Sequence, residues 1–269
     1  MEQPSPQILA IIVEETGLRL GQVVSVAELL REGGTVPFIA RYRKERTGEL
    51  DEVAIRTIEE RLAYLSELEE RKNVIRRSID EQGKLSSELA TRIDSCRQKT
   101  ELEDLYLPYK PKRRTKATIA RERGLEPLAD LIAAQEITSG TLDEVALPFV
   151  DLDRDVPDAA AALAGASHNL AERLAEDADS RGFVRRLTAD EGVLCSRVDP
   201  AKAGSVSKFE MYYDYREPLK AVPSHRMLAM RRGEKEELLL LTIEAPVESI
   251  VSGLTSRLRH KQSIFGQLL

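Results

Sequence analysis

One helical part of the chain ends and the next begins within a single stretch, residues 102–124, which reads LEDLYLPYKPKRRTKATIARERG. The stretch starts as the end of a helix, is interrupted by Pro108 and Pro111, and resumes as a helix near Thr118. From Pro108 to Gly124 it carries seven positive side chains and one negative, whereas the whole chain has a net charge of -6. Such a local inversion of charge is typical of a surface that meets a polyanion.

Upstream of this stretch, residues 51–105 are predicted to form a long antiparallel helical hairpin. Neither Pro nor Gly interrupts residues 51–82, and apolar residues recur there mostly at steps of three and four. Gly83 is expected to end this helix, and Ser86 to cap a return helix that runs to Leu105. Because the connection is only a few residues long, the two helices must be antiparallel neighbours.

Residues 1–50 are predicted to form three short helices joined by glycine-containing turns. The pair Gly33–Gly34 ends the second helix, and the third begins at once with VPFIARYRKE. This pattern fits a helix-turn-helix-like bundle, and it also fits a generic three-helix packing unit. A basic exposed side of the third helix adds three candidate phosphate contacts, Arg41, Arg43 and Lys44.

Residues 106–190 are predicted to form a second helical subdomain. Short helices are expected at 118–123 and 126–134, and TLDE, which begins at Thr141, fits a capping box. An Ala-rich helix is expected over 157–181, with Leu163 and His168 among the residues of its buried side and Gly182 at its end.

Residues 191–269 form a mixed segment. Its convincing strand candidates, VLCSRV at 193–198 and LLLLTI at 238–243, are expected to pair as a two-stranded ribbon. Elsewhere, Leu, Ala, Glu and Arg dominate, and all four favour helices. The predicted fold class is therefore all-α: a multihelical scaffold with a helix-turn-helix-like bundle, a long antiparallel helical hairpin and a minor two-stranded β ribbon.

The composition predicts a soluble, cytoplasmic protein. The chain opens with polar residues rather than a signal peptide, and no apolar run approaches the roughly 20 residues that span a bilayer. Cys96 and Cys195 lie far apart in the sequence and near no other ligand-type residues, so both are expected to be reduced and buried.

No pattern in the sequence indicates an enzyme. The three histidines lack zinc-ligand spacing, and the chain has no phosphate-binding loop, dinucleotide-binding glycine pattern or nucleophile elbow. Pairs of acidic residues fall on long charged helices, where solvated faces are the expected reading. We therefore expect no catalytic residue, no cofactor, no metal and no small-molecule substrate.

The basic segment, residues 110–116, has two readings from its residues alone. Its cations are spaced along an extended chain, so each could neutralise a phosphate and displace a counterion. The same cations could instead dock the segment onto the chain's own acidic helices. The candidate phosphate contacts in this segment are Lys110, Lys112, Arg113, Arg114 and Lys116.

Several long segments carry a resemblance to a known family. They are EGGTVPFIARYRKERTGELDE at 32–52, EERLAYLSELEERK at 59–72, DEQGKLSSEL at 80–89, KTELEDLYLPYKPKRRTKATIARERGLEPLA at 99–129, LAERLAEDADSR at 170–181 and EPLKAVPSHRMLAMRRGE at 217–234. Together they resemble the bacterial Tex family, S1-domain transcription accessory proteins related to a eukaryotic elongation factor.

The resemblance implies a nucleic-acid-binding protein linked to transcription or RNA handling. Members of that family are much longer, with an RNase H-like domain, helix-hairpin-helix elements and a C-terminal OB-fold RNA-binding domain after the helical region. This sequence is expected to be the N-terminal helical region only, leading toward the RNase H-like domain. No catalytic residue carries over to it.

Two functional hypotheses follow. The first is a nucleic-acid-binding module that contacts RNA or DNA through phosphates. The alternative is a non-catalytic interaction scaffold, in which the hairpin of residues 51–105 docks polymerase, ribosome or the remaining domains. Neither hypothesis includes a membrane partner.

Overall fold

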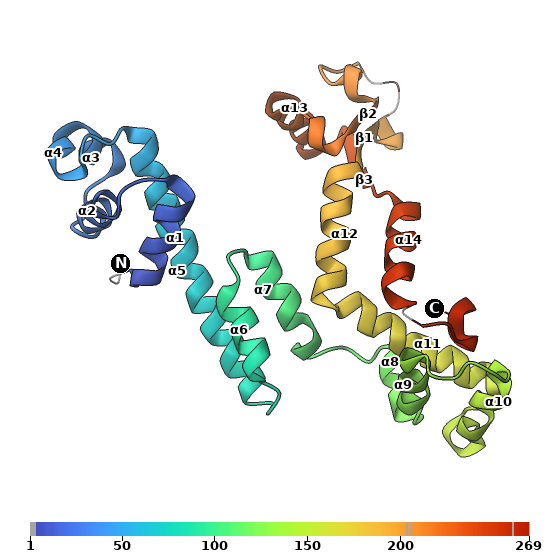
Figure 1. Cartoon of the computed structure of the whole chain (residues 1–269). Helices are drawn as coiled ribbons and strands as arrows, with labels where there is room; N and C mark the ends of the chain where they lie inside the picture. Colours follow the sequence, from blue (N-terminus) through green and yellow to red (C-terminus); the bar gives the residue numbers. More distant parts are fainter. Residues whose placement is uncertain (1–3, 203, 205, 260, 269) are drawn as a thin grey trace. The chain divides into compact units, whose positions relative to one another are not determined.

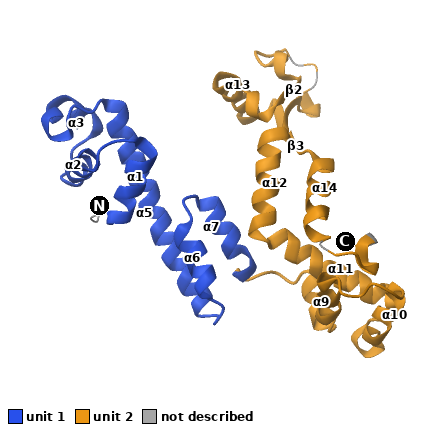
Figure 2. Ribbon diagram, viewed as in Figure 1, with its two compact units in different colours: residues 1–109 blue, residues 110–269 orange. Residues whose placement is uncertain are grey.

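This computed structural model describes residues 4–202, 204, 206–259 and 261–268. Within them the chain forms fourteen α-helices and one small antiparallel sheet, so the predicted all-α class with a minor β element is confirmed. The chain divides into two compact units, residues 1–109 and 110–269 (Figures 1 and 2). The finer division into residues 1–50, 51–105, 106–190 and 191–269 stays a prediction.

Unit 1 is built on one long helix, α5 (Glu52–Asp80), which is about 44 Å long at ~1.5 Å per residue. Asp51 caps its N-terminus by accepting a hydrogen bond from the Ala54 N–H at 2.7 Å. The other helices of the unit are α1 (Pro6–Thr16), α2 (Leu20–Arg31), α3 (Val36–Tyr42), α4 (Lys44–Thr47), α6 (Ser87–Ser95) and α7 (Lys99–Tyr106), followed by the 3₁₀ turn η1 (Leu107–Tyr109).

Two groups of helices cover α5 along its length (Figure 1). Helices α1, α2 and α3 pack near its start, where Ile39 of α3 and Ile55 and Ile58 of α5 are fully buried. Helices α6 and α7 pack along its later turns. Each fully buried aliphatic side chain contributes about 1.5–3 kcal/mol of hydrophobic free energy, so α5 holds the unit together through one continuous apolar face.

The return arm of the hairpin is two helices, so the prediction of one continuous helix to Leu105 is wrong. The chain leaves the helical conformation at Cys96, although neither Pro nor Gly lies there. Backbone groups at the break form hydrogen bonds with side chains of α5. The buried Lys72 ammonium donates to the Asp94 carbonyl at 2.9 Å, and the Lys99 N–H donates to the Tyr64 hydroxyl at 2.9 Å. These long-range bonds stabilise the interruption.

The predicted third helix is also interrupted. Helix α3 ends at Tyr42, and Arg43 has φ -129° and ψ 26° before α4 begins at Lys44. Two sets of contacts tie the following segment to α2 and its end: Arg46 pairs with Glu28 and Glu32, and the Gln22 amide donates a hydrogen bond to the Gly48 carbonyl at 3.1 Å. Thr47, between them, is fully buried. The break at Arg43 lets the chain turn onto α2.

Unit 2 has two cores. In the first, helices α8 and α9 and a connecting region pack against α11, and the 3₁₀ turn η7 returns to this core with the fully buried Phe265. In the second, the sheet packs against α13 around Phe209, Met230 and Leu239. The helices of the unit are α8 (Lys116–Glu122), α9 (Glu126–Ala134), α10 (Leu142–Ala146), α11 (Ala159–Glu176), α12 (Ala178–Glu191), α13 (Ser224–Lys235) and α14 (Val247–Leu258), and η7 spans Ile264–Gln267.

The Ala-rich helix ends earlier than predicted. It splits into α11 and α12 at Asp177, whose carboxylate accepts a hydrogen bond from the Ser180 N–H at 2.7 Å and so caps the second helix. Gly182, predicted as the end, lies inside α12. His168, predicted on the buried side, is exposed, and the buried positions are Ala162, Ala166 and Asn169.

The sheet has one strand more than predicted. The two predicted strands correspond to β1 (Val193–Val198) and β3 (Leu239–Glu244), which pair antiparallel. The additional strand, β2 (Asp214–Pro218), pairs with the other side of β1, giving the order β2-β1-β3. Pro218 lies at the end of this edge strand, opposite Val193, where a residue without an N–H is tolerated.

None of the helices among the described residues is both long and apolar enough to cross a membrane. Cys96 and Cys195 are buried and form no disulfide, as the sequence predicted.

Candidate nucleic-acid interface

The basic segment, residues 110–116, connects η1 to α8 as an irregular chain. Pro108 and Pro111 keep it out of a helix until Thr115. The Thr115 hydroxyl accepts a hydrogen bond from the Thr118 N–H at 3.1 Å, which caps the first turn of α8. Helix formation therefore resumes at the end of the segment, and the cations before it lie on irregular backbone.

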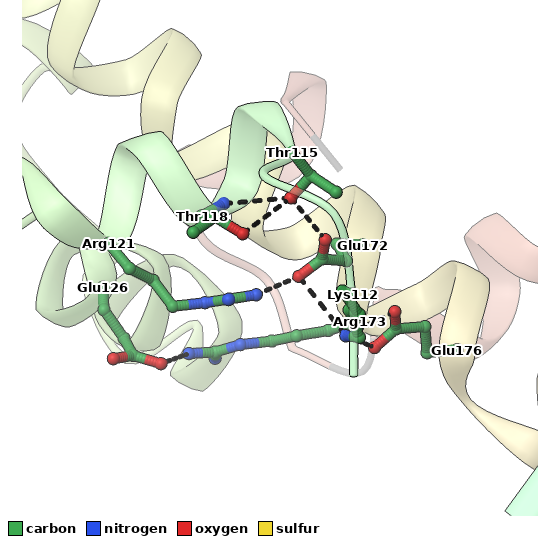
Figure 3. A network of polar contacts seen from close by, with 8 residues as sticks. All are labelled: Lys112, Thr115, Thr118, Arg121, Glu126, Glu172, Arg173 and Glu176. Carbon is green, nitrogen blue, oxygen red and sulfur yellow. Dashed lines mark hydrogen bonds and ion pairs between the residues drawn. The ribbon is translucent and has the colours of Figure 1, made fainter. Parts of the chain in front are cut away.

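Lys112 and its neighbours form an ion-pair network with helix α11 (Figure 3). The Lys112 ammonium lies 2.5 Å from the Glu176 carboxylate and 3.7 Å from that of Glu172. Glu172 also accepts a hydrogen bond from the Thr115 hydroxyl at 2.8 Å and pairs with Arg121 of α8. Lys112 is therefore engaged within unit 2 and helps to fasten the basic segment to α11.

Glu172 is the most enclosed member of this network, with 11% of its side chain exposed. Burial by itself raises the pKa of its carboxyl group. The hydrogen bond from Thr115 and the charges of Lys112 and Arg121 outweigh that effect, so the net result is a pKa below the ordinary value of 4.5. Glu172 is therefore held in its charged form.

The other cations of the segment differ in their surroundings. Arg114 pairs with Glu122 at 2.6 Å, and both side chains are at least half exposed, so this pair is a weak surface interaction. Lys110 is half-buried. Arg113 and Lys116 are exposed, and within the described residues neither forms an ion pair.

The second group of predicted cations lies at the end of α3 and the start of α4. Arg41, Arg43 and Lys44 are all exposed, and none of them pairs with an acid in the part of the chain that the structure describes. Their neighbour Arg46 is different, because it pairs with Glu28 of α2 and with Glu32, the residue that follows α2. The eight predicted residues therefore include five exposed cations that have no acidic partner within the described ranges: Arg41, Arg43, Lys44, Arg113 and Lys116.

Two aromatic side chains beside Arg41, Arg43 and Lys44 were not among the predicted site residues. Phe38 and Tyr42 are exposed on α3, and their ring centroids lie 5.4 Å apart. Their spacing of four residues places them on one helix face, so the sequence did contain a signal for them. Glu172 and Glu176 were also missed, and no local pattern links them to Lys112, which lies about sixty residues away.

Among the described residues, which leave out His260, no group of three or more His, Cys, Asp or Glu side chains is placed to hold a metal ion.

Two family models match the chain. Residues 6–80 match the Tex-like protein N-terminal domain, and residues 139–264 match the Tex central region-like model. The chain belongs to the Tex family. The site on α3 lies within the first match, and the basic segment lies between the two.

Relatives of this Tex-family chain are found in bacteria and in humans. Protein YhgF of Escherichia coli is 52% identical over 87% of this chain and 30% of its own length. Transcriptional accessory protein Tex of Neisseria gonorrhoeae is 48% identical over 88% of this chain and 31% of its own length. The human S1 RNA-binding domain-containing protein 1 is 28% identical over 88% of this chain and 24% of its own length. The chain thus spans about a third of the length of the bacterial relatives it matches.

Proposed function

We propose that this chain is a non-catalytic, nucleic-acid-binding module of a Tex-family transcription accessory protein, and that it binds RNA or DNA through phosphates. One observation carries the proposal: Arg41, Arg43, Lys44, Arg113 and Lys116 are exposed and have no acidic partner among the described residues. An exposed cation without a carboxylate partner can exchange its counterion for a phosphate without first breaking an ion pair. Lys110, Lys112 and Arg114 are secondary contacts in this proposal.

The names of two relatives support this reading. One bacterial relative is named a transcriptional accessory protein, and the human relative is named for an S1 RNA-binding domain. We infer that the present chain contributes phosphate contacts to the same kind of role and supplies no chemistry of its own.

The test is a salt titration of the binding of the 269-residue chain to single-stranded RNA and to duplex DNA. Replacing the five cations by Gln should weaken binding on the order of tenfold or more. It should also reduce the salt slope by about 4, because each of the five phosphate contacts contributes roughly 0.7–0.9 to that slope.

A matched control removes five exposed cations that do have acidic partners: Arg56→Gln, Arg76→Gln, Arg97→Gln, Lys99→Gln and Lys208→Gln. The control loses the same charge and should keep most of the affinity and slope. Equal losses in both variants would mean that only net charge matters and would contradict the proposal. Absence of salt-sensitive binding by the wild type would favour the interaction scaffold, whose hairpin would then be tested for a protein partner.

A further inference from the structure

The outer face of α3 carries two aromatic side chains that are not buried in the core of unit 1. The inner face of this helix buries Val36 and Ile39 against the rest of unit 1. On the outer face, 41% of Phe38 and 62% of Tyr42 remain exposed, with their ring centroids 5.4 Å apart and their planes inclined by 45°. By contrast, Phe209 and Phe265 of unit 2 are buried. Large apolar side chains left together at a surface indicate a contact site.

Arg43 makes this face both aromatic and cationic. Its guanidinium carbon lies 5.1 Å from the centre of the Phe38 ring, and the group donates a hydrogen bond to the Tyr42 carbonyl at 3.2 Å. Arg43 holds this position beside the Phe38 ring at the point where helix α3 ends. Because no described acid pairs with Arg43, its charge is available to a ligand while its stacking holds it beside the rings. We name Phe38, Tyr42 and Arg43 the α3 stacking face.

We propose that the α3 stacking face binds unpaired nucleotides, so that the ligand of this region is a single strand rather than a duplex. Aromatic rings stack on nucleobases whatever their sequence, and neighbouring cations contact the backbone. The bases of a duplex are already stacked on one another and do not present their faces to a protein. The bordering cations Arg41 and Lys44 suit a polyanion.

This inference rests on the proposed nucleic-acid-binding function and adds to it the kind of strand. Single-stranded RNA and single-stranded DNA share the chemistry that the face recognises, which is an unpaired base on a phosphate backbone. A protein partner would also contact the rings, but its binding would not depend on unpaired nucleobases.

The test compares the wild-type 269-residue chain with the variant F38L/Y42L, which keeps the apolar character of the face and its net charge but removes both π surfaces. The probes are a short oligouridine, a short oligothymidine and a duplex DNA of equal length. The Kd for both single strands should rise about ten- to a hundredfold, while the Kd for the duplex changes by less than about threefold. The salt slope should not change, because no cation is removed.

A control variant, V53A/V74A, removes exposed apolar side chains of the same unit, 72% and 57% exposed, and should bind all three probes as the wild type does. A base-analogue fluorophore in the single strand gives a direct stacking signal, which is readily isolated because the chain contains no Trp. Its quenching should be lost in F38L/Y42L. Unchanged single-strand affinity in that variant, or an equal loss for strand and duplex, overturns the inference while the proposed function stands. A wild type that binds none of the probes overturns both.

Discussion

Residues 41–44 and residues 110–116 are both rich in positive charge, but they hold it in different ways. At the end of α3 and the start of α4, Arg41, Arg43 and Lys44 are exposed and have no acidic partner among the described residues, and two exposed rings lie beside them. In the basic segment, Lys112 is bound by two carboxylates of α11 (Figure 3). Arg114 is bound by one carboxylate of α8. The denser cluster in sequence is therefore the one whose charge is more fully used within the fold. A count of cations does not measure what remains for a ligand.

Two double variants, each with two cations removed from one region, should show the largest difference between the regions. R41Q/R43Q should weaken the binding of single-stranded RNA by about tenfold and lower the salt slope by about 1.5, because two phosphate contacts are lost. K112Q/R114Q removes the same charge, but it removes cations that are already paired, so the affinity should fall by no more than about twofold. Fluorescence anisotropy at several salt concentrations measures both. If K112Q/R114Q is the more damaging pair, the contrast between the two regions is wrong.

A smaller effect should follow from making the second region resemble the first. In E172Q/E176Q the carboxylates that hold Lys112 become neutral amides of similar shape. Lys112, and Arg121 with it, should then be able to take a phosphate, raising the affinity about threefold and the salt slope by about 1–2. The double substitution D190N/E191Q, on the exposed end of α12, removes two acids that bind no described cation and serves as the control. An equal gain in both variants would mean that the effect is only one of net charge.

Much of the helical pattern could be predicted because its signals are local. The absence of Pro and Gly before Gly83 marked α5 closely, and Ser86 and the capping box at Thr141 accept the hydrogen bonds that their sequence contexts predicted. Strand β1 has the bounds that were predicted for VLCSRV. In each case the residues that decide the element lie within it or next to it.

The errors arise where distant residues decide. The break after Ser95 depends on Lys72 and Tyr64 of α5, and β2 depends on pairing with β1. The same holds for the candidate site: the sequence shows where the cations are concentrated, but only the fold identifies the partners of Lys112. Asp177 is an exception, because the hydrogen bond that it accepts from the Ser180 N–H is local. The prediction of one Ala-rich helix over 157–181 did not take this capping signal into account.

The smallest expected effect is on the ionisation of Glu172, which reports how firmly the basic segment is fastened. Because its pKa in the folded chain is lowered below 4.5, its ion pairs stabilise the fold fully above that pH, and this contribution is lost as the pH falls through the lowered pKa. A carboxyl NMR titration should therefore find its midpoint below 4.5.

T115V removes the hydrogen bond that most favours the charged form of Glu172, so the titration midpoint should rise. T115S keeps the hydroxyl and should leave the midpoint unchanged. An unshifted midpoint in T115V would mean that Lys112 and Arg121 alone hold Glu172 ionised. The segment would then be fastened by charge and not by the hydrogen bond from Thr115 to Glu172, and it would come loose at high salt.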